Sequence, residues 1–252
     1  MTDIRSAAHT PVTSVKGRRA LITGGTTGIG RAIAVLLASE GARVFVCGRD
    51  PQHLEDALAA IRAVGEGDGI SIDLVDPEAT GRLFDAAAEA LGGLDIAVMN
   101  AAVPAEGLTD MSEAEIREAI AVDFTAYLLG AKHASQRIEH GDIVLIGSMS
   151  AHVLGPGSTV YAGIKAGIAG FSEALRRELG DDRIRVSLVE PGKTKADFPK
   201  PDVSDAEQKE KVAKEETLRA QDIAVGVHYL LTQPSRTVVQ QLTIVPRAQT
   251  AE

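Results

Sequence analysis

The stretch STVYAGIKAGIAGF (158–171) places Tyr161 four residues before Lys165. On a helix this spacing puts both side chains on one face. A phenol has a reference pKa of about 10 and is a poor acid or base at neutral pH, but a nearby ammonium group favours the phenolate and lowers that pKa. Tyr161 could then donate a proton to an alkoxide or remove one from an alcohol. The pair is interpreted as a reactive centre, and the alternative is two surface residues at a common helical spacing.

Ser148 lies thirteen residues before Tyr161, at the end of the apolar stretch GDIVLIGS (141–148). Such a stretch predicts a strand, which would place the hydroxyl at the strand's carboxyl end. There it could hydrogen-bond a substrate oxygen and hold that oxygen near the phenol. The helix that carries Tyr161 and Lys165 should face the core with a different, apolar stripe. That stripe consists of Val160, Ile164, Ile168, Phe171 and Leu175.

A glycine-rich turn joins the first predicted strand to the first predicted helix. Gly24, Gly28 and Gly30 follow the spacing G-x-x-x-G-x-G. Glycine adopts positive φ and lets the backbone come close to a ligand. The amino terminus of the helix that follows carries N–H groups and partial positive charge, which suit a diphosphate. Strand, turn and helix in this order predict a dinucleotide-binding site.

Short apolar runs alternate with helical patterns along the chain, and no fixed repeat is apparent. Apolar runs suit strands that are covered on both faces. The pattern predicts an α/β fold with one Rossmann-type, doubly wound parallel sheet of about seven strands and helices on both faces. Residues 17–252 would form this single domain after a flexible extension (1–16). The strands are expected at 19–24, 43–48, 69–74, 94–100, 141–148, 184–190 and 238–245, and the helices near 29–40, 51–64, 77–91, 112–137, 158–179 and 219–233.

The segment 193–218 interrupts the alternation because it is charged and contains Pro199 and Pro201. Loops that follow the carboxyl ends of strands line the ligand cleft in such folds. Two interpretations remain for this segment. It is either a substrate flap beside the ligand site or a solvated helix with a loop.

The composition excludes several classes of function. There are 26 basic and 35 acidic residues, a net charge of −9, so nucleic acid is not expected as a partner. A single cysteine excludes an intrachain disulfide, and the six histidines show no metal-ligand spacing, so no metal site is predicted. The chain has neither a secretory signal pattern nor an apolar run of membrane-spanning length, so no membrane segment and a cytoplasmic location are expected.

The glycine turn TGGTTGIG (23–30) resembles the T-G-x-x-x-G-I-G turn of the short-chain dehydrogenase/reductase family. Other motifs of that family follow in order. MNAA (99–102) is similar to its N-N-A-G motif at two of four positions, YAGIK (161–165) to its Y-x-x-x-K, and EPGKTKA (190–196) to its P-G turn. Ser148 also has the family's spacing from the tyrosine. The resemblance runs from about residue 17 to the end of the chain.

This resemblance implies an oxidoreductase that binds a nicotinamide cofactor and acts on a small-molecule carbonyl or alcohol. It also implies a homodimer or homotetramer. Ser148, Tyr161 and Lys165 would be catalytic, and Lys165 would also hydrogen-bond the nicotinamide ribose. The residues that the resemblance assigns to cofactor binding are Gly24, Thr26, Thr27, Gly28, Ile29, Gly30, Arg49, Asp73, Leu74, Asn100, Ala101, Lys165, Pro191, Gly192 and Thr194.

Asp123 occupies the place where the family usually has an asparagine that completes the catalytic set. It shares a helix face with Ile116, Ile120 and Tyr127, so it should face the interior. A buried carboxylate is costly unless it is paired or protonated. Asp123 could stand in for the asparagine in a water relay to Lys165, which is the favoured interpretation. It could instead pair directly with Lys165, or be structural.

The residues after the second strand indicate which nicotinamide cofactor is used. An acid there usually grips the ribose hydroxyls of NAD, but this chain has Gly48 followed by Arg49. A guanidinium can hold the 2′-phosphate of NADP through charge-assisted bonds. Asp50 would favour NAD if it turned inward, but before Pro51 it suits the N-cap of the next helix, which leaves Arg49 free. NADP(H) is therefore predicted over NAD(H).

These observations together predict an NADP(H)-dependent oxidoreductase with Tyr161 as general acid and base. The alternative is a nucleotide-binding sensor or scaffold of the same fold with little or no catalysis, which the altered MNAA motif and Asp123 would suit. A methyltransferase on a similar sheet would not need Tyr161, Lys165 and Ser148 in this register. The substrate pocket is expected to lie between 103–108, 152–158 and the flap.

Overall fold

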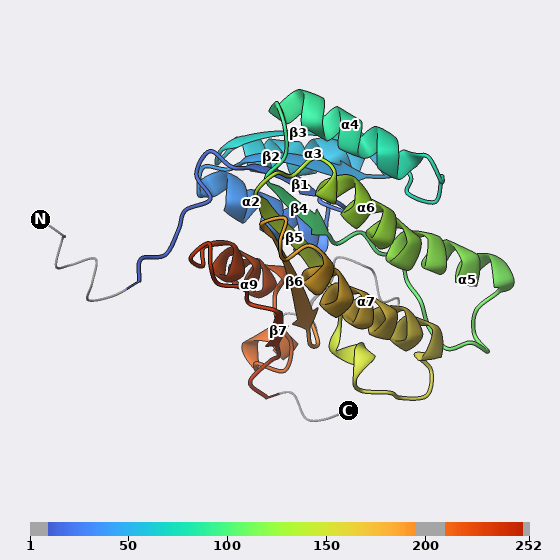
Figure 1. Ribbon diagram of the computed structural model, residues 1–252. Helices are drawn as coiled ribbons and strands as arrows, with labels where there is room; N and C mark the ends of the chain where they lie inside the picture. The colour runs from blue at the N-terminus through green and yellow to red at the C-terminus, as the bar shows by residue number, and fades with distance from the viewer. Residues whose placement is uncertain (1–9, 195–209, 249–252) are drawn as a thin grey trace, which may run out of the picture.

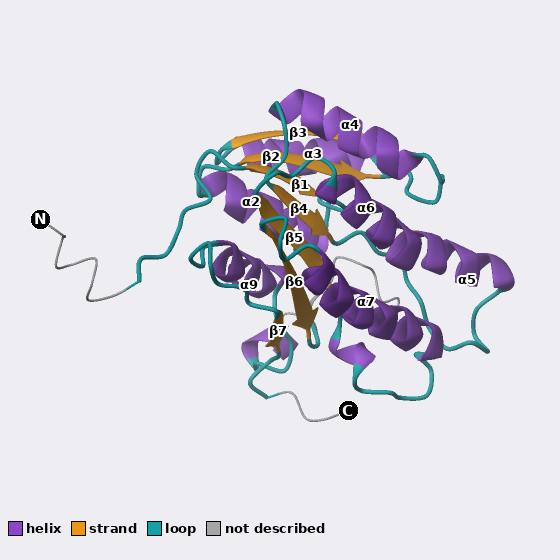
Figure 2. Ribbon diagram, viewed as in Figure 1, coloured by secondary structure: helices purple, strands orange, loops and turns teal. Residues whose placement is uncertain are grey.

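The computed structural model describes residues 10–194 and 210–248, and these form a seven-stranded sheet with the order β3-β2-β1-β4-β5-β6-β7 (Figure 2). Every neighbouring pair is parallel. The doubly wound parallel sheet predicted from the sequence is thus confirmed. The strands are β1 Arg19–Ile22, β2 Arg43–Gly48, β3 Glu66–Ser71, β4 Ile96–Met99, β5 Gly141–Ile146, β6 Ile184–Pro191 and β7 Gln241–Ile244.

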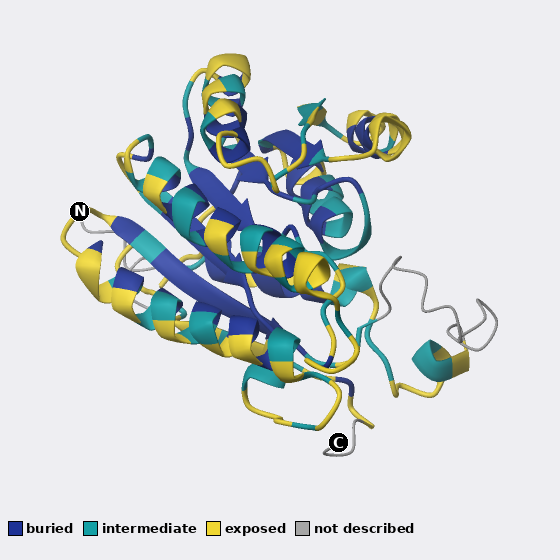
Figure 3. Ribbon diagram, turned by 90° about the vertical axis from the view of Figure 1, so that its right-hand side faces the viewer, coloured by how far each residue is buried: buried dark blue, intermediate teal, exposed yellow. Residues whose placement is uncertain are grey.

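Helices cover both faces of the sheet (Figure 1). On one face lie α2 Gly28–Ser39, α3 Pro51–Arg62 and α9 Ala220–Leu231, whose apolar side chains share one core with β1 and β2. On the other face lie α4 Ala79–Leu91, α6 Ala126–Ser135 and α7 Thr159–Glu178. Figure 3 shows the consequence, since the central strands are buried and the outer helix surfaces are exposed.

The two edge strands depart most from the sequence prediction. The expected strand 69–74 is β3 Glu66–Ser71, and the expected 238–245 is the shorter β7 Gln241–Ile244. Each edge strand pairs with only one neighbour and consists of exposed and half-buried residues. An edge strand therefore need not be apolar, and an apolar run does not mark its ends.

The helix expected over 112–137 is interrupted. It begins with a capping box of Ser112 and Glu115, but α5 Glu113–Ile120 is separated from α6 by a turn of π-helix, η1 Ala121–Thr125. Turns of π-helix occur often at functional sites. Asp123 lies in this turn, with none of its surface exposed, which agrees with the prediction that it faces the interior.

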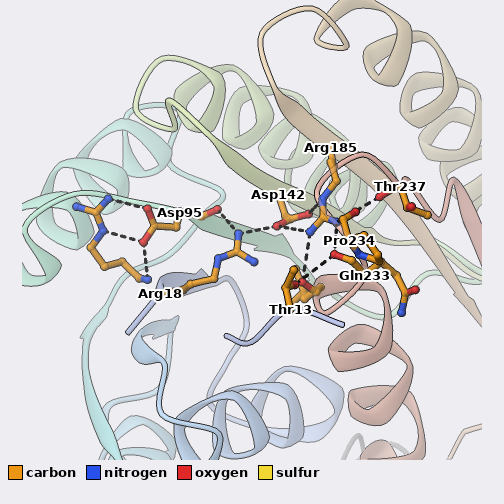
Figure 4. A network of polar contacts seen from close by, with 10 residues as sticks. Thr13, Arg18, Asp95, Asp142, Arg185, Gln233, Pro234 and Thr237 are labelled. Atoms are coloured by element: carbon orange, nitrogen blue, oxygen red, sulfur yellow. Dashed lines mark hydrogen bonds and ion pairs between the residues drawn. The ribbon is translucent and has the colours of Figure 1, made fainter. Parts of the chain in front are cut away.

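A network of ion pairs lies at the amino ends of the strands (Figure 4). The glycine turn follows the carboxyl end of β1, at the opposite edge of the sheet. Asp142, at the start of β5, accepts hydrogen bonds from Arg18 Nη2 at 2.5 Å and Arg185 Nε at 2.7 Å. Arg185 also donates to the carbonyl of Gln233, beyond the end of α9. This network ties β5 and β6 to the start of the first strand.

The predicted amino-terminal extension (1–16) lies partly within the described residues. Val15 is completely buried, and Thr13 N donates to Thr232 O at 2.7 Å. Its final residues are therefore part of the packed domain, held at the end of α9. Residues 1–9 are outside the described part of the chain.

The predicted flap (193–218) also lies largely outside the described residues, since 195–209 are not among them. Its two ends meet, because Leu218 N donates to Lys193 O at 2.8 Å. Among residues 10–194 and 210–248, the structure contains no helix with the length and apolar character needed to cross a membrane.

Candidate active site

A pocket of about 570 Å³ opens at the carboxyl ends of the strands. Parallel α/β sheets bind their ligands at this edge, where strand order reverses on the two sides of β1 and β4. The predicted site residues that line the pocket are Gly24, Thr26, Thr27, Gly28, Ile29, Arg49, Asp73, Leu74, Asn100, Ala101, Ser148, Tyr161, Lys165, Pro191, Gly192 and Thr194.

Two predicted site residues, Gly30 and Asp123, do not line the pocket. Gly30 lies behind the turn, where a Cβ would collide with the Gly24 carbonyl and the Asn100 side chain. Its role is to let α2 pack closely against the turn. Val122 lines the pocket in place of its neighbour Asp123, which is buried one layer deeper.

The glycine turn fits a diphosphate. Gly24 has φ +62°, and a Cβ there would lie 2.8 Å from Ala101 Cα. Gly28 has φ +51° and faces open space. Its neighbour Thr27, the N-cap of α2, makes no side-chain capping bond, and the first turn of α2 has no acidic residue. The partial positive charge of this helix terminus is thus not offset by a local carboxylate, which suits an anionic ligand.

Asn100 fixes the shape of this turn rather than only lining the pocket. Its side-chain nitrogen donates to the carbonyl oxygens of Thr23 at 3.0 Å and Gly24 at 3.2 Å. Thr23 Oγ1 in turn accepts from the N–H groups of Asn100 and Ala101, at 2.9 and 3.0 Å. Thr23 was not predicted as a site residue, although it lies in the quoted turn motif.

Ser148, Tyr161 and Lys165 meet in the pocket as predicted. Ser148 follows β5 and caps η2 Met149–Ala151, with its Oγ accepting from Ser150 N at 3.1 Å. Tyr161 and Lys165 come from the first turns of α7, and Lys165 Nζ lies 5.5 Å from the centre of the Tyr161 ring. Lys165 is buried, with 2% of its surface exposed, and lies at the inner end of the pocket.

Burial dominates the electrostatics of the pair. It raises the pKa of Tyr161, although a hydrogen bond with Ser148 lowers that pKa, and the charge of Asp123 raises it further. Burial likewise lowers the pKa of Lys165, with Asp123 acting in the opposite direction. The sequence predicted a Tyr161 pKa below its usual value. The structure shows the reverse, because the removal of the phenol from water outweighs the hydrogen bond with Ser148.

Tyr127 belongs to this site and was missed as a site residue. Its hydroxyl donates to Ile146 O at 3.2 Å, and Lys165 Nζ donates to the same carbonyl at 3.3 Å. Lys165 Nζ also lies 5.3 Å from the centre of the Tyr127 ring. Tyr127 is almost completely buried and comes one helical turn after Asp123. The sequence placed it on the Asp123 face, which was the available signal.

Asp123 has an incomplete set of partners. Its Oδ1 accepts from Val103 N at 2.8 Å, and its Oδ2 is buried without a hydrogen-bond partner. Burial raises the pKa of Asp123 to about 6, although the charge of Lys165 and the Val103 N–H lower it. The Oδ2 atom therefore makes no direct contact with Lys165, which argues against the tight Asp123–Lys165 pair considered from the sequence.

At the other end of the pocket, Arg49 is not free as the sequence predicted. Its Nη1 lies 3.0 Å from Glu118 Oε1 on α5. Asp50 behaves as predicted, because its side chain accepts from His53 N at 2.9 Å and caps α3. Asp73 lines the same region, and its Oδ1 accepts from Val75 N at 3.0 Å.

A buried carboxylate beside the Ser148 loop was also missed. Glu190, at the end of β6, is completely buried, and His152 Nε2 lies 2.9 and 3.0 Å from its two oxygens. Gln241 Nε2 donates to the same carboxylate at 2.5 Å. The contact between His152 and Glu190 ties the loop after Ser148 to the sheet.

Comparisons with known proteins agree with this architecture. The family model for short chain dehydrogenase matches residues 18–208. Elsinochrome reductase 1 of Elsinoe fawcettii is 38% identical over 188 residues, which cover 72% of this chain and 70% of that protein. The 3-oxoacyl-acyl-carrier-protein reductase of Escherichia coli is 32% identical over 190 residues, covering 73% of this chain and 76% of that protein.

The similarity extends to solved structures. A short chain dehydrogenase from Burkholderia cenocepacia, crystallised in complex with NADP, superposes with a TM-score of 0.83 at 32% sequence identity. The match covers 93% of this chain and 98% of that one. The glycine turn, the Ser148, Tyr161 and Lys165 cluster and these matches lead to one conclusion: the chain belongs to the short-chain dehydrogenase/reductase family of oxidoreductases.

Proposed function

We propose that this chain is an NADP(H)-dependent oxidoreductase that moves a hydride between nicotinamide and a carbonyl or secondary alcohol of a small molecule. The observation that carries this proposal is the convergence of Ser148, Tyr161 and Lys165 in the pocket that the glycine turn also lines. The names of two relatives, both reductases, and the NADP complex of a structural neighbour support it.

When bound, a nicotinamide cofactor would supply or accept the hydride, and this chain's own residues would carry out the proton transfer. Burial raises the pKa of Tyr161, so its hydroxyl is protonated at neutral pH. It would donate this proton to the substrate oxygen as that oxygen becomes an alkoxide, which is a stronger base than the phenolate. The Ser148 hydroxyl, at the end of β5, would orient the same oxygen. This arrangement favours reduction as the working direction.

Lys165 and Asp123 would restore the proton to Tyr161. Lys165 Nζ is held by Ile146 O and faces the Tyr161 ring. Asp123 presents a buried oxygen without a partner behind the pocket wall. We propose that this oxygen takes part in the relay to Lys165, the role that an asparagine has in the family. Unlike an asparagine, Asp123 can itself hold a proton.

For the cofactor, Arg49 is proposed to bind the 2′-phosphate, and Asp73 and Leu74 to lie beside the adenine. Lys165 would bind the nicotinamide ribose, and Thr194 would contact the nicotinamide amide. In the structure Thr194 Oγ1 donates to Gly192 O at 3.0 Å, so this contact requires its hydroxyl to turn. The chain is proposed to work as a homodimer or homotetramer, as members of the family commonly do.

The substrate is proposed to enter between two of the segments predicted from the sequence. Val160 N donates to Glu106 O at 3.1 Å, and Leu108 N to Thr159 Oγ1 at 2.9 Å, so 103–108 and the start of α7 lie side by side. Leu108 and Leu154, in the two predicted segments, expose 62% and 75% of their surfaces, and Val103 lines the pocket itself. These apolar side chains favour a modest apolar carbonyl compound.

The experiment that tests the mechanism replaces Tyr161 with Phe and follows NADPH oxidation with a panel of carbonyl compounds. Loss of general acid catalysis should lower turnover by about 10²–10⁴-fold, while NADPH binding stays close to that of the unchanged protein. Turnover by the unchanged protein with any carbonyl would discard the sensor or scaffold alternative. Equal turnover by both proteins would contradict the role of Tyr161.

A further inference from the structure

The ion pair between Arg49 and Glu118 joins two distant parts of the chain at one end of the pocket. Arg49 directly follows β2 and lines the pocket, whereas Glu118 is carried by α5. Arg49 Nη1 and Glu118 Oε1 lie 3.0 Å apart. Both side chains remain partly in water, since 60% of Arg49 and 39% of Glu118 are exposed. An incoming ligand can therefore reach the guanidinium.

The other carboxylates near Arg49 have local partners of their own. Asp50 caps α3 through His53 N, and Asp73 accepts from Val75 N. Glu118 is thus the carboxylate that Arg49 engages within the described residues. The carboxylate comes from outside the strand–turn–helix unit in which nucleotide specificity is usually sought.

Glu118 acts differently on the two nicotinamide nucleotides. The 2′-phosphate of NADP(H) carries negative charge and would compete with Glu118 for the same guanidinium donors. If the Glu118 carboxylate stayed near Arg49, it would also repel the 2′-phosphate. The 2′-hydroxyl of NAD(H) is neutral, so it requires no such displacement and can donate a hydrogen bond to a carboxylate.

We infer that Glu118 is a cofactor-selectivity residue that occupies Arg49 and weakens the binding of NADP(H) relative to NAD(H). This inference rests on the proposed function, in which Arg49 holds the 2′-phosphate. It means that the preference for NADP(H) is set by two residues from different elements. It also means that α5 contributes to the cofactor site although it follows the fourth strand.

The expected effect is modest because exposed ion pairs contribute little free energy. Glu118→Gln keeps the length of the side chain and removes its charge. We expect calorimetric titration to show NADPH binding to Glu118→Gln about 2- to 10-fold more tightly than to the unchanged protein. NADH should bind with the same affinity or more weakly. Raising the salt concentration should reduce the gain for NADPH, since the effect is electrostatic.

Glu113→Gln provides a matched control on the same helix. Glu113 is 80% exposed and pairs with Arg117, which does not line the pocket, whereas Glu118 pairs with the pocket residue Arg49, so replacement of Glu113 should leave both affinities unchanged. A further variant, Arg49→Ala with Glu118→Gln, tests the route of the effect. In the Arg49→Ala background, Glu118→Gln should increase NADPH affinity less, because no guanidinium remains to be freed from its pair with residue 118.

The outcomes separate this inference from the proposed function. If Arg49→Ala weakens NADPH binding but Glu118→Gln gives the same NADPH affinity as Glu113→Gln, the role of Glu118 is overturned and that of Arg49 stands. If Arg49→Ala leaves NADPH binding unchanged, or the unchanged protein binds neither nucleotide, both are overturned. Tighter NADPH binding by Glu118→Gln but not by Glu113→Gln supports both the role of Glu118 and that of Arg49.

Discussion

Two buried aspartates lie at opposite ends of the sheet and have opposite surroundings. Asp142, at the amino end of β5, is 2% exposed and accepts from the guanidinium groups of Arg18 and Arg185. Asp123, beside the pocket at the carboxyl end, is fully buried and accepts from a single backbone N–H. One carboxylate is neutralised by cations that contact it directly, and the other has an oxygen with no partner.

The difference indicates that the two ends of the sheet serve different purposes. Buried polar groups in folded proteins are almost always hydrogen-bonded, so an unsatisfied carboxylate oxygen calls for an explanation. Proteins tend to depart from such rules at functional sites. At the amino end both oxygens of Asp142 have cationic partners, and we expect this network to stabilise the fold. The carboxyl end keeps an unsatisfied acid next to the lysine and tyrosine to which we assign the chemistry.

The largest stability effect should come from the satisfied end. Asp142→Ala leaves two largely buried guanidinium groups without their carboxylate, which should cost about 3–5 kcal/mol in the free energy of unfolding. Asp85 pairs with Arg137 at the surface, and Asp85→Ala should cost only about 0–1 kcal/mol. Urea unfolding of both variants measures the difference, and equal costs would show that the amino-end network is not the stabilising one.

Asp123→Asn should change stability in the opposite direction, raising the free energy of unfolding instead of lowering it. The folded protein raises the pKa of Asp123 from 3.8 to about 6, so the protonated form is the one that folding favours. The contribution of Asp123 to stability is complete below about pH 4, where the group is protonated in both the folded and the unfolded state. It is lost as the pH rises through about 6, which lowers the free energy of unfolding by roughly 3 kcal/mol. The neutral amide does not titrate, so the variant should gain stability over the unchanged protein across this range.

Denaturant unfolding at several pH values tests this sign directly. The free-energy difference between Asp123→Asn and the unchanged protein should grow from about pH 4 to about pH 7. A difference that does not change with pH would mean that folding leaves the pKa of Asp123 at its ordinary value. The contrast drawn with Asp142 would then be wrong.

Tyr127→Phe should have a smaller effect than the variants of Asp142 and Asp123. It removes one of two donors to the Ile146 carbonyl, and Lys165 still satisfies that oxygen, so we expect a loss of about 1 kcal/mol in stability. Turnover should fall far less than in Tyr161→Phe, because Tyr127 acts only by helping to hold Lys165 in place. If Tyr127→Phe abolished turnover as Tyr161→Phe should, Tyr127 would be the proton donor instead.

The sequence was sufficient for features that depend on local spacing and on burial of whole strands. The central strands β1, β2, β4, β5 and β6 are covered on both faces, so their apolar runs predicted them well. The glycine turn and the pair of Tyr161 and Lys165 were found because their spacing is short and fixed. The edge strands β3 and β7 were misplaced because their residues are not required to be buried.

Features that depend on contacts between distant residues could not be read from the sequence. Glu118 lies 69 residues from Arg49 along the chain, and His152 lies 38 from Glu190. Only the packing of the domain brings each pair together. The pKa of Tyr161 was predicted with the wrong direction for the same reason, since its burial comes from the tertiary structure, whereas the spacing to Lys165 is local.

The measurement that tests the central claim most directly is a calorimetric titration of the purified chain with NADPH and, separately, with NADH. A site built for NADP(H) at the carboxyl end of the sheet predicts tighter binding of NADPH, with that preference lost in Arg49→Ala. Tighter binding of NADH would contradict the assignment of the 2′-phosphate to Arg49. Binding of neither nucleotide would contradict the proposed NADP(H)-dependent function itself.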